Sequence, residues 1–595
     1  MITERLALLR QQMAKRTIAM YIIPTADFHE SEYVGDYFKA RQYITGFTGS
    51  AGVAIITQKE AGLWTDGRYF VQAEQQLRET GITLYRKGEE GVPSENEFIE
   101  QTLGEGEILG FDGRVINSKW GKQLEDIVCK KNGSLSVEED LVDIIWTDRP
   151  TMSAQPVELL DLRYSGERTR DKIHRIRKQM QEKSVDVHLI SSLCDIAWIL
   201  NVRGNDIVYV PVVLSFLAIL QEQCIWFVQE QALTEEIRAY LNENGIITQP
   251  YNDFYSYVSS LSEKCVWFDS AVMNYRICSS LSNNVKVIDE PDASLRMKAI
   301  KNETQIQNLR NAHLKDGIAM CKFMYWLKTN VGKIPMTELS VSQYLLELRS
   351  KQEGFLELSF DTICGYAEHG AIVHYSANEE SDVQLKPEGL LLVDSGGHYY
   401  EGTTDVTRTF ALGDVTLQMK EDFTRVCRAN INLANTKFRY GCTGMNIDVI
   451  AREPLWEAGL DYNHGTGHGV GYLLNVHEGP NAFRWRRIKG SEPVCVLEEG
   501  MITTDEPGIY REGQYGIRTE SELLCVKGQK NSFGQFMGFE NLTYVPIDLD
   551  ALLPEQMTEM ERKRLNEYHG MVYENVAPFL EQKEAEWLRN YTRAI

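Results

Sequence analysis

The stretch that decides the fold is LLLVDSGGHYYEGTTDVTRTF, residues 390–410. An apolar run from Leu390 to Val393 predicts a buried strand that ends in Asp394, and a glycine-rich turn leads into a second strand that carries Asp405. This spacing of the two carboxylates suits two adjacent antiparallel strands joined by a hairpin. The segment therefore predicts a strand pair that carries two acidic side chains.

A second strand pair repeats this arrangement further along the chain. GMITTDEPGIY (500–510) predicts a strand that ends in Glu506 before a Pro-Gly turn, and YGIRTESELLC (515–525) predicts a strand that carries Glu520. Two similar hairpins indicate an internally duplicated domain with a site between its halves.

Histidines stand between these two strand pairs. HGTGHGVGYLLNVHEGP (464–480) holds His464, His468 and His477 among glycines. Four carboxylates on apolar strands repel one another and are costly to remove from water without a cation. Two divalent cations would balance four carboxylates and one neutral imidazole, and such an oxygen-rich set favours Mn²⁺, Fe²⁺ or Co²⁺ over a structural zinc.

The first half of the chain contains a weak internal repeat. RQQMAKRTIAMYII (10–23) and RKQMQEKSVDVHLI (177–190) each predict the end of an amphipathic helix followed by a short apolar strand. This repeat indicates two related α/β domains. The segment near 147–165, which has two prolines and little periodicity, predicts the first boundary, and a second boundary is expected near 289–302. Between the repeats, WTDGRY (64–69) predicts a hairpin turn at Asp-Gly.

The second boundary leads into a long helix, and the chain is also expected to end in helices. Asn302, with Gln305 three residues later, predicts a capping box at the start of that helix. From about residue 541 the chain becomes polar and charged, and its clearest helices are expected at Met557 to Tyr568 and Glu581 to Tyr591.

Composition excludes several classes of function. The 595 residues correspond to roughly two to four domains. With 62 Lys+Arg against 85 Asp+Glu, the net charge of −23 disfavours binding to nucleic acid or to an anionic membrane. The apolar stretch from Ile207 to Leu220 is too short to span a bilayer and contains Pro211.

Cysteine usage and the first residues bear on location. The 11 cysteines are odd in number and include no CxxC pair, which disfavours a disulfide framework and a zinc knuckle. The opening MITERLALLRQQMAKR has no uninterrupted apolar core of the kind that a secretory signal needs. We therefore expect a reduced, cytoplasmic location.

The motifs VDSG, GTTDVTRT, HGTGHGVG, VHEGP, DEPGIY and GIRTE resemble those of the pita-bread metallopeptidases, the family of methionine aminopeptidase, prolidase and aminopeptidase P. The resemblance extends to SFDTICGYAEHGAIVHYSA (359–377). It implies a chain of α/β and α+β class with two creatinase-like N-terminal domains, 1–155 and 156–297. A pita-bread catalytic domain, 298–595, follows them, with a helical extension from about 541. Two creatinase-like copies make the chain similar to the long, cytosolic form of aminopeptidase P.

The resemblance also implies a set of metal ligands. Residue by residue, five positions match the family's ligands: Asp394, Asp405, His468, Glu506 and Glu520. In the family pattern Asp405 and Glu520 bridge two metals, Asp394 completes one of them, and His468 with Glu506 completes the other.

Other positions match residues that act on substrate or steady the ligands. His374, in IVHYSA, matches the histidine near the leaving proline nitrogen, and His477, in VHEGP, matches the one that contacts the substrate peptide. These two histidines and Glu506 form the implied catalytic set. Arg518 and Tyr510 match groups that hold the ligands in place.

The chain departs from the family pattern at two places. His369 stands where relatives usually have asparagine, and FRWRRIKGSEPVCVLEE (483–499) is longer and more basic than usual. These departures concern the rim of the site and leave the metal ligands untouched.

The resemblance implies an Xaa-Pro aminopeptidase, which releases the N-terminal residue X from peptides with proline in second position. It implies two divalent metals per subunit, Mn²⁺ first, with Co²⁺, Fe²⁺ and Zn²⁺ as alternatives, peptide substrates and a homodimer. The competing functions are a prolidase, which cleaves only X-Pro dipeptides, and a catalytically inactive pita-bread protein used for binding. The retained ligand set disfavours the inactive alternative.

Overall fold

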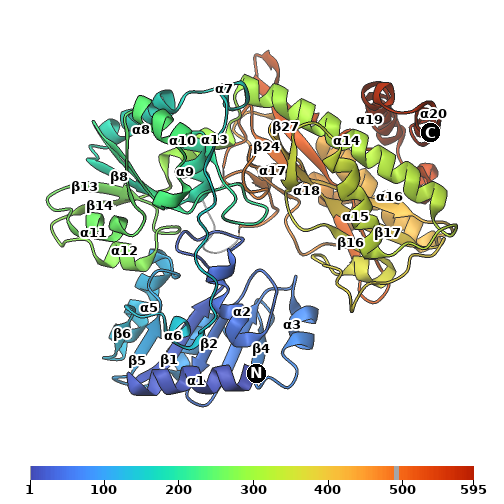
Figure 1. Cartoon of the computed structure of the whole chain (residues 1–595). Helices are drawn as coiled ribbons and strands as arrows, with labels where there is room; N and C mark the ends of the chain where they lie inside the picture. Colours follow the sequence, from blue (N-terminus) through green and yellow to red (C-terminus); the bar gives the residue numbers. More distant parts are fainter. Residues whose placement is uncertain (1, 488–494) are drawn as a thin grey trace. The chain divides into compact units, whose positions relative to one another are not determined.

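The computed structural model describes residues 2–487 and 495–595, which form two compact units (Figure 1). Unit 1 comprises Met1–Leu160 and Arg168–Ser294, and unit 2 comprises Asp161–Glu167 and Leu295–Ile595. Among the described residues, no helix combines the length and the apolar character needed to cross a lipid bilayer.

Unit 1 contains two six-stranded sheets with the same connectivity. Their strand orders are β4-β3-β2-β1-β5-β6 and β12-β11-β10-β8-β13-β14. In each sheet a central strand, β1 or β8, pairs antiparallel with one neighbour and parallel with the other. Each central strand is the apolar strand at the end of one copy of the predicted sequence repeat, so the two α/β domains are confirmed.

The elements around the first sheet are α1 (Ile2–Lys15), β1 (Ile18–Pro24), α2 (Ala40–Thr45), β2 (Val53–Thr57), β3 (Ala61–Thr65), α3 (Phe70–Gln76), β4 (Thr83–Arg86), α4 (Glu95–Thr102), β5 (Ile108–Phe111), α5 (Ser118–Lys130), β6 (Ser134–Ser136) and α6 (Leu141–Ile145). Those around the second are β7 (Glu158–Leu159), α8 (Thr169–Glu182), β8 (Val187–Ile190), α9 (Leu193–Leu200), β9 (Val202–Arg203), β10 (Ser215–Leu220), β11 (Cys224–Val228), α10 (Glu235–Glu243), β12 (Ile246–Pro250), α11 (Asp253–Ser259), β13 (Cys265–Phe268), α12 (Tyr275–Ser279) and β14 (Lys286–Asp289).

Strand β1 shows why the sequence here is continuously apolar. Tyr21 and Ile23 pack in one hydrophobic core, and the alternate residues Met20 and Ile22 pack in another. Successive side chains of a strand point to opposite faces, so a sheet covered on both faces needs apolar residues at every position.

The predicted hairpin at Asp66-Gly67 is wrong. β3 ends at Thr65, the chain enters α3, and β4 then pairs parallel with β3. Parallel strands need a crossover connection, which a two-residue turn cannot supply.

Unit 2 contains the predicted duplicated frame. Two antiparallel sheets, β16-β17-β20 and β21-β28-β27-β24, each hold one of the predicted strand pairs. The helices of this unit are α7 (Leu162–Ser165), α14 (Glu303–Asn330), α15 (Glu338–Ser350), α16 (Leu417–Ala434), α17 (Gly444–Ile447), α18 (Val449–Trp456), α19 (Glu559–Val576) and α20 (Gln582–Tyr591), and α13 (Ala293–Ala299) begins in unit 1. Its strands are β15 (Phe355–Leu358), β16 (Ile363–Tyr366), β17 (Leu390–Ser395), β18 (Gly397–Tyr399), β19 (Gly402–Thr403), β20 (Val406–Ala411), β21 (Phe438–Arg439), β22 (Gly467–His468), β23 (Ala482–Phe483), β24 (Ile502–Asp505), β25 (Gly508–Arg511), β26 (Tyr515–Arg518), β27 (Ser521–Asn531) and β28 (Gly534–Asn541).

Helices α14 and α15 are held together by a buried ion pair. The capping box predicted at Asn302 and Gln305 is present at the start of α14. Arg349, near the end of α15, is fully buried, and its Nε and Nη2 donate to the two carboxylate oxygens of Asp316 on α14 at 2.7 and 3.0 Å. The hydroxyl of Tyr399 also donates to Asp316, at 3.0 Å.

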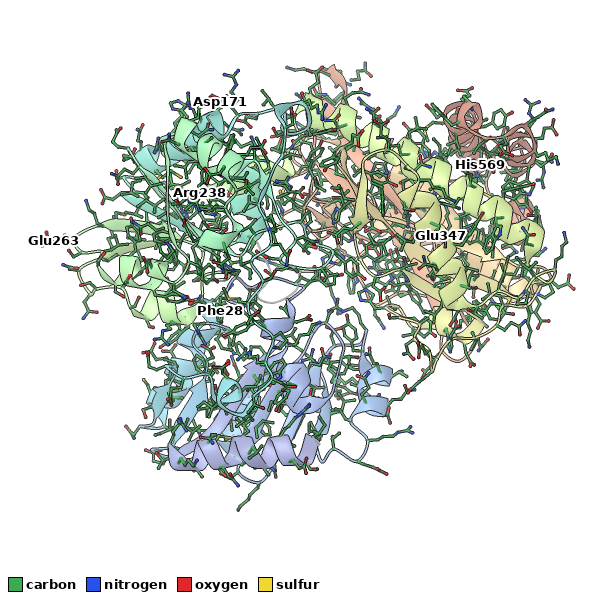
Figure 2. All side chains as sticks on the ribbon, in the orientation of Figure 1. Phe28, Asp171, Arg238, Glu263, Glu347 and His569 are labelled. Atoms are coloured by element: carbon green, nitrogen blue, oxygen red, sulfur yellow. The ribbon has the colours of Figure 1, made fainter. Side chains whose placement is uncertain are left out.

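The C-terminal helices α19 and α20 occur where the sequence predicts them. α19 carries His569 (Figure 2). The side chain of His569 is completely buried. Its Nε2 accepts a hydrogen bond of 3.1 Å from the Ile547 N–H, so the ring must be neutral there. Burial accordingly lowers the pKa of His569 to about 3.

Candidate metal centre

The first strand pair places Asp394 and Asp405 at the same end of its sheet. β17 pairs antiparallel with β20, and Asp394 lies opposite Thr407. Asp405 lies one residue before β20 and not within the strand, because the intervening chain forms the short pair β18–β19. The expectation that a simple hairpin joins the two strands is therefore wrong, although the carboxylates are brought to the same end.

The second strand pair has the same plan. Glu506 directly follows β24 and Glu520 directly precedes β27, and the last residue of β24, Asp505, lies opposite Ser521. The intervening chain again forms its own hairpin, β25–β26. The duplication predicted from the sequence thus extends to the inserted hairpins.

Direct hydrogen bonds join the two halves at the carboxylates. The Glu520 N–H donates to the Thr407 carbonyl at 3.0 Å, and the Thr407 hydroxyl donates to Glu520 Oε2 at 2.7 Å. As a result, one ligand atom each from Asp405, His468 and Glu520 lies within 4.8 Å of the others. Such a cluster is small enough to surround one cation.

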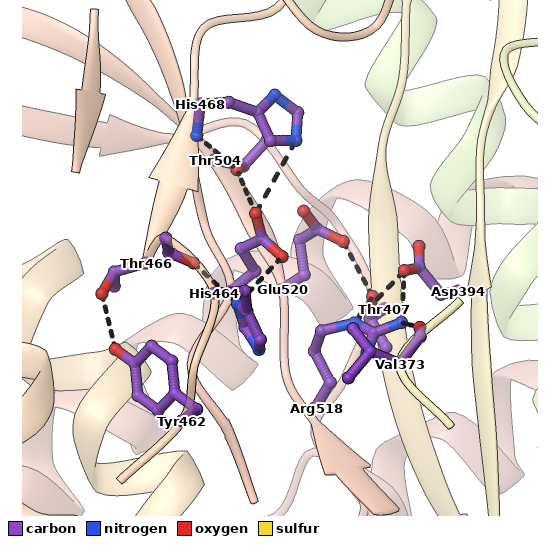
Figure 3. Close-up of polar contacts among 12 residues, drawn as sticks. Val373, Asp394, Thr407, Tyr462, His464, Thr466, His468, Thr504, Arg518 and Glu520 are labelled. Carbon is purple, nitrogen blue, oxygen red and sulfur yellow. Dashed lines mark hydrogen bonds and ion pairs between the residues drawn. The ribbon is translucent and has the colours of Figure 1, made fainter. Parts of the chain in front are cut away.

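His468 lies close to both Asp405 and Glu506. Its backbone N–H donates to Thr504 Oγ1 at 3.1 Å, which fixes the residue on β22 (Figure 3). Its Nε2 lies 3.5 Å from Asp405 Oδ2 and 3.7 Å from Glu506 Oε1. The imidazole nitrogen of His468 therefore lies within 3.7 Å of two carboxylate oxygens that, like it, could bind a cation.

The electrostatics of this cluster call for a cation. Burial, and then the charges of neighbouring carboxylates, raise the pKa values of Asp405 and Glu520 well above the usual range. Burial also raises the pKa of Glu506. In addition, Asp394 Oδ1 is buried and has no hydrogen-bond partner among the described residues. The donor set therefore fits divalent metals with oxygen and nitrogen ligands.

Arg518 and Tyr510 lie beside these acids. Arg518 is 2% exposed, and its Nη2 and Nε donate to Asp394 Oδ2 at 2.6 and 3.2 Å. Its Nη1 donates to the Tyr510 hydroxyl at 2.8 Å, and the same hydroxyl lies 2.8 Å from His464 Nε2. This chain of contacts ties the Asp394 half of the site to the glycine-rich segment.

His464 is a site residue whose role the sequence did not reveal. Its Nδ1 lies 3.9 Å from Glu506 Oε2, and burial lowers the pKa of His464 to about 3, which keeps its ring neutral. The signal for it was its place in HGTGHGVG, four residues before His468.

Comparisons with known proteins follow the same division of the chain. Models of the creatinase/prolidase N-terminal domain match residues 5–143 and 148–305. The model of metallopeptidase family M24 matches residues 307–527, and the C-terminal region of that family matches 535–595. Aminopeptidase P2 of Arabidopsis thaliana is 37% identical over 100% of this chain and 89% of its own length. The chain belongs to metallopeptidase family M24.

Two further proteins match over the same extent, and a third matches over less of the chain. Xaa-Pro aminopeptidase 1 of Dictyostelium discoideum is 36% identical over 100% of this chain and 97% of its own length. The crystal structure of an X-prolyl aminopeptidase from Caenorhabditis elegans, described as a cytosolic enzyme with a di-nuclear active site, covers both chains completely with a TM-score of 0.94 and 33% identity. An Xaa-Pro dipeptidase from Bacillus anthracis covers 65% of this chain with a TM-score of 0.52 and 23% identity, a likeness of fold alone.

Of the two histidines expected to contact substrate, His477 lies against His468, and His374 follows a residue that is hydrogen-bonded to Arg518. The ring of His477 is perpendicular to that of His468, with centroids 4.3 Å apart. His374 is half-buried and follows Val373, whose carbonyl accepts a hydrogen bond of 3.4 Å from Arg518 Nη2.

The two departures from the M24 pattern lie in different surroundings. His369 contacts a buried glutamate, Glu338, through its Nδ1 at 2.9 Å. The basic segment 483–499 is exposed from Arg484 to Arg487, and residues 488–494 lie outside the described part of the chain.

Proposed function

We propose that this chain is a metal-dependent aminopeptidase that hydrolyses the X-Pro bond and releases the N-terminal residue of peptides with proline in second position. The observation that carries the proposal is the cluster of Asp405, His468 and Glu520 within 4.8 Å, in an M24 chain that matches Xaa-Pro aminopeptidases over their whole length. Proline removes the N–H of the scissile bond and restricts the backbone, which sets these substrates apart from those of ordinary aminopeptidases.

We assign the metals to five ligands: Asp394, Asp405, His468, Glu506 and Glu520. Two divalent cations held there would acidify a bound water and polarise the scissile carbonyl. Mn²⁺ is the metal that we propose first, with Co²⁺, Fe²⁺ and Zn²⁺ as alternatives, because the set holds four carboxylates and one imidazole.

The chain's own groups have separate roles in this proposal. Glu506, with its raised pKa and its position between His464 and His468, accepts a proton from the attacking water. His374 contacts the leaving proline nitrogen, and His477 contacts the substrate peptide. Both roles rest on the match of their motifs to those of the family.

The test is an assay of the purified protein on Gly-Pro-Pro-type and bradykinin-type peptides with added Mn²⁺. Release of the first residue is expected, and no release would contradict the proposal. A parallel assay on Gly-Pro distinguishes the alternative, because a prolidase would cleave the dipeptide and leave the longer peptides intact. A sample with no bound transition metal and no activation by Mn²⁺ would instead favour the inactive binding protein.

We also propose the domain boundaries 1–155, 156–297 and 298–595, a homodimer and a cytoplasmic location. Matches of the family models on either side of residues 143–148 and 305–307 support the boundaries. The location is supported by a C. elegans relative described as cytosolic, and by 11 cysteines that form no disulfide within the described residues. The exposed aromatic rings of Trp456 and Trp485, 6.1 Å apart, support a subunit contact, which light scattering would test.

A further inference from the structure

A buried glutamate outside the group of proposed metal ligands holds the segment that carries His374 in place through hydrogen bonds. Glu338 is the first residue of α15 and is completely buried. One carboxylate oxygen, Oε1, accepts from the Tyr366 N–H at 2.7 Å and from His369 Nδ1 at 2.9 Å. The other, Oε2, accepts from the Tyr375 hydroxyl at 2.8 Å. A buried carboxylate is tolerated only with such partners, and all three belong to one segment.

The first turn of α15 also holds the far end of that segment. The Glu338 N–H donates to the Val383 carbonyl at 3.3 Å, and the Leu339 N–H donates to Asp382 Oδ1 at 3.0 Å. Thr337 and Gln384 form an isolated antiparallel bridge. Residues 366–384 therefore form a loop whose two ends both contact the N-terminus of α15, and His374 lies near the middle of this loop.

The residue that precedes His374 is hydrogen-bonded to Arg518, which in turn contacts a proposed metal ligand. The carbonyl of Val373 accepts from Arg518 Nη2 at 3.4 Å, and the same nitrogen donates to Asp394 at 2.6 Å (Figure 3). The preceding turn packs directly on β26, where a Cβ on Gly516 would lie 1.6 Å from the Gly370 carbonyl. This contact leaves the turn no room to shift toward β26.

His374 thus lies between two fixed neighbours. Val373 is bound through Arg518 to a proposed metal ligand, and Tyr375 is bound through Glu338 to the start of α15. Because a displacement of about 1 Å in a group near the reacting atoms can lower a rate by about 10²-fold, two such anchors bear directly on catalysis.

We propose that Glu338 is a positioning residue for the X-Pro hydrolysis reaction, and that it acts on His374 through the Tyr375 hydroxyl and the His369 ring. The inference rests on the proposed function, because it gives His374 its place in that reaction. It also gives His369, the departure from the family pattern, a role as a second side-chain donor to the same carboxylate.

The experiment uses two variants of the full-length, Mn²⁺-loaded enzyme. Tyr375→Phe removes one hydroxyl from this network, and Glu338→Gln replaces the acceptor of all three hydrogen bonds. The matched control is Tyr591→Phe, because that hydroxyl donates to a different carboxylate, Asp550 Oδ2, at 2.7 Å and has no part in the Glu338 network. For each protein kcat, KM and bound metal are measured on a Gly-Pro-Pro peptide.

We expect kcat to fall on the order of 10- to 100-fold in Tyr375→Phe and in Glu338→Gln, with KM and bound metal near the wild-type values. Tyr591→Phe is expected to match the wild type. Each variant is also made in a His374→Ala background, where the loss caused by Tyr375→Phe or Glu338→Gln should disappear. A merely structural role would produce the same loss with or without His374.

Two results would overturn the inference while leaving the proposed function intact. One is an active wild type in which Tyr375→Phe keeps the wild-type kcat, a variant that is expected to fold even where Glu338→Gln does not. The other is a loss of equal size in the His374→Ala background. A wild type that releases no residue from the peptide contradicts the proposed function itself, and the inference with it.

Discussion

Arg518 fixes the Asp394 side of the proposed metal centre, and its replacement by lysine separates the effect of geometry from that of charge. Two of its nitrogens donate to Asp394 Oδ2, and a third donates to the Tyr510 hydroxyl. Lysine keeps the positive charge, but its single ammonium cannot span these acceptors as a planar guanidinium does. Arg518→Lys therefore removes contacts and leaves the net charge unchanged.

The expected size of the effect can be worked from the contacts that are lost. One hydrogen bond to a charged group contributes about 1.5–3 kcal/mol, and removing a group that orients a metal ligand weakens metal binding about 10- to 100-fold. The two magnitudes agree, because a 100-fold change in affinity corresponds to about 2.7 kcal/mol. We expect the concentration of Mn²⁺ that gives half-maximal activity to rise about 10- to 100-fold.

The assay removes metal with a chelator, dialyses the protein and follows hydrolysis of a Gly-Pro-Pro peptide during titration with Mn²⁺. Arg149→Lys in unit 1 is the matched control, because Arg149 Nη1 pairs with Asp140 at 2.6 Å with both side chains buried. This control should keep the wild-type titration. An Arg518→Lys protein with the wild-type half-saturating concentration would contradict this role of Arg518, even if its maximal rate were lower.

Three further predictions concern catalysis, acid stability and packing. His374→Ala should keep both metals while kcat falls on the order of 10²–10⁴-fold, whereas Glu506→Gln should abolish turnover and lower the amount of bound metal. An unchanged kcat in His374→Ala, or a full metal content in Glu506→Gln, would contradict these roles. The pKa of His569 is about 3 in the folded protein and about 6.5 in the unfolded chain, so the free energy of unfolding falls as the pH drops from 6.5 toward 3. Between pH 6 and pH 5, denaturant unfolding should show a loss of this free energy that is about 1.2 kcal/mol larger in the wild type than in His569→Gln. Arg349→Met should lower the free energy of unfolding by about 3–5 kcal/mol, because it leaves the buried Asp316 without its cation, and adding Asp316→Asn should restore part of this loss.

The parts of the fold that the sequence predicted are those decided by neighbouring residues. The capping box at Asn302 and Gln305 forms within one helical turn. The apolar run from Leu390 to Val393 forms a buried strand. The proposed metal ligands were predicted through motifs that are themselves short. Each of these signals is contained in a few consecutive residues.

The parts that the sequence did not predict depend on contacts between distant residues. Asp66-Gly67 has the composition of a hairpin turn, but the parallel pairing of β3 with β4 requires a helical crossover after it. Glu338 carries no local sign of its role, because its partners begin 28 residues further along the chain. The orientation of His464 toward Tyr510 likewise requires β25 and the glycine-rich segment to meet.

The duplicated frame explains how one small region comes to hold four carboxylates. Each half contributes one acid where a strand ends and one where its partner strand begins, and the hydrogen bonds between Thr407 and Glu520 set the halves against each other. Arg518 offsets only part of this charge, since it contacts Asp394 and leaves Asp405 and Glu520 buried beside one another. The remaining repulsion is relieved by protons or by cations, so the geometry that gathers the acids also makes metal binding contribute to the stability of the catalytic unit.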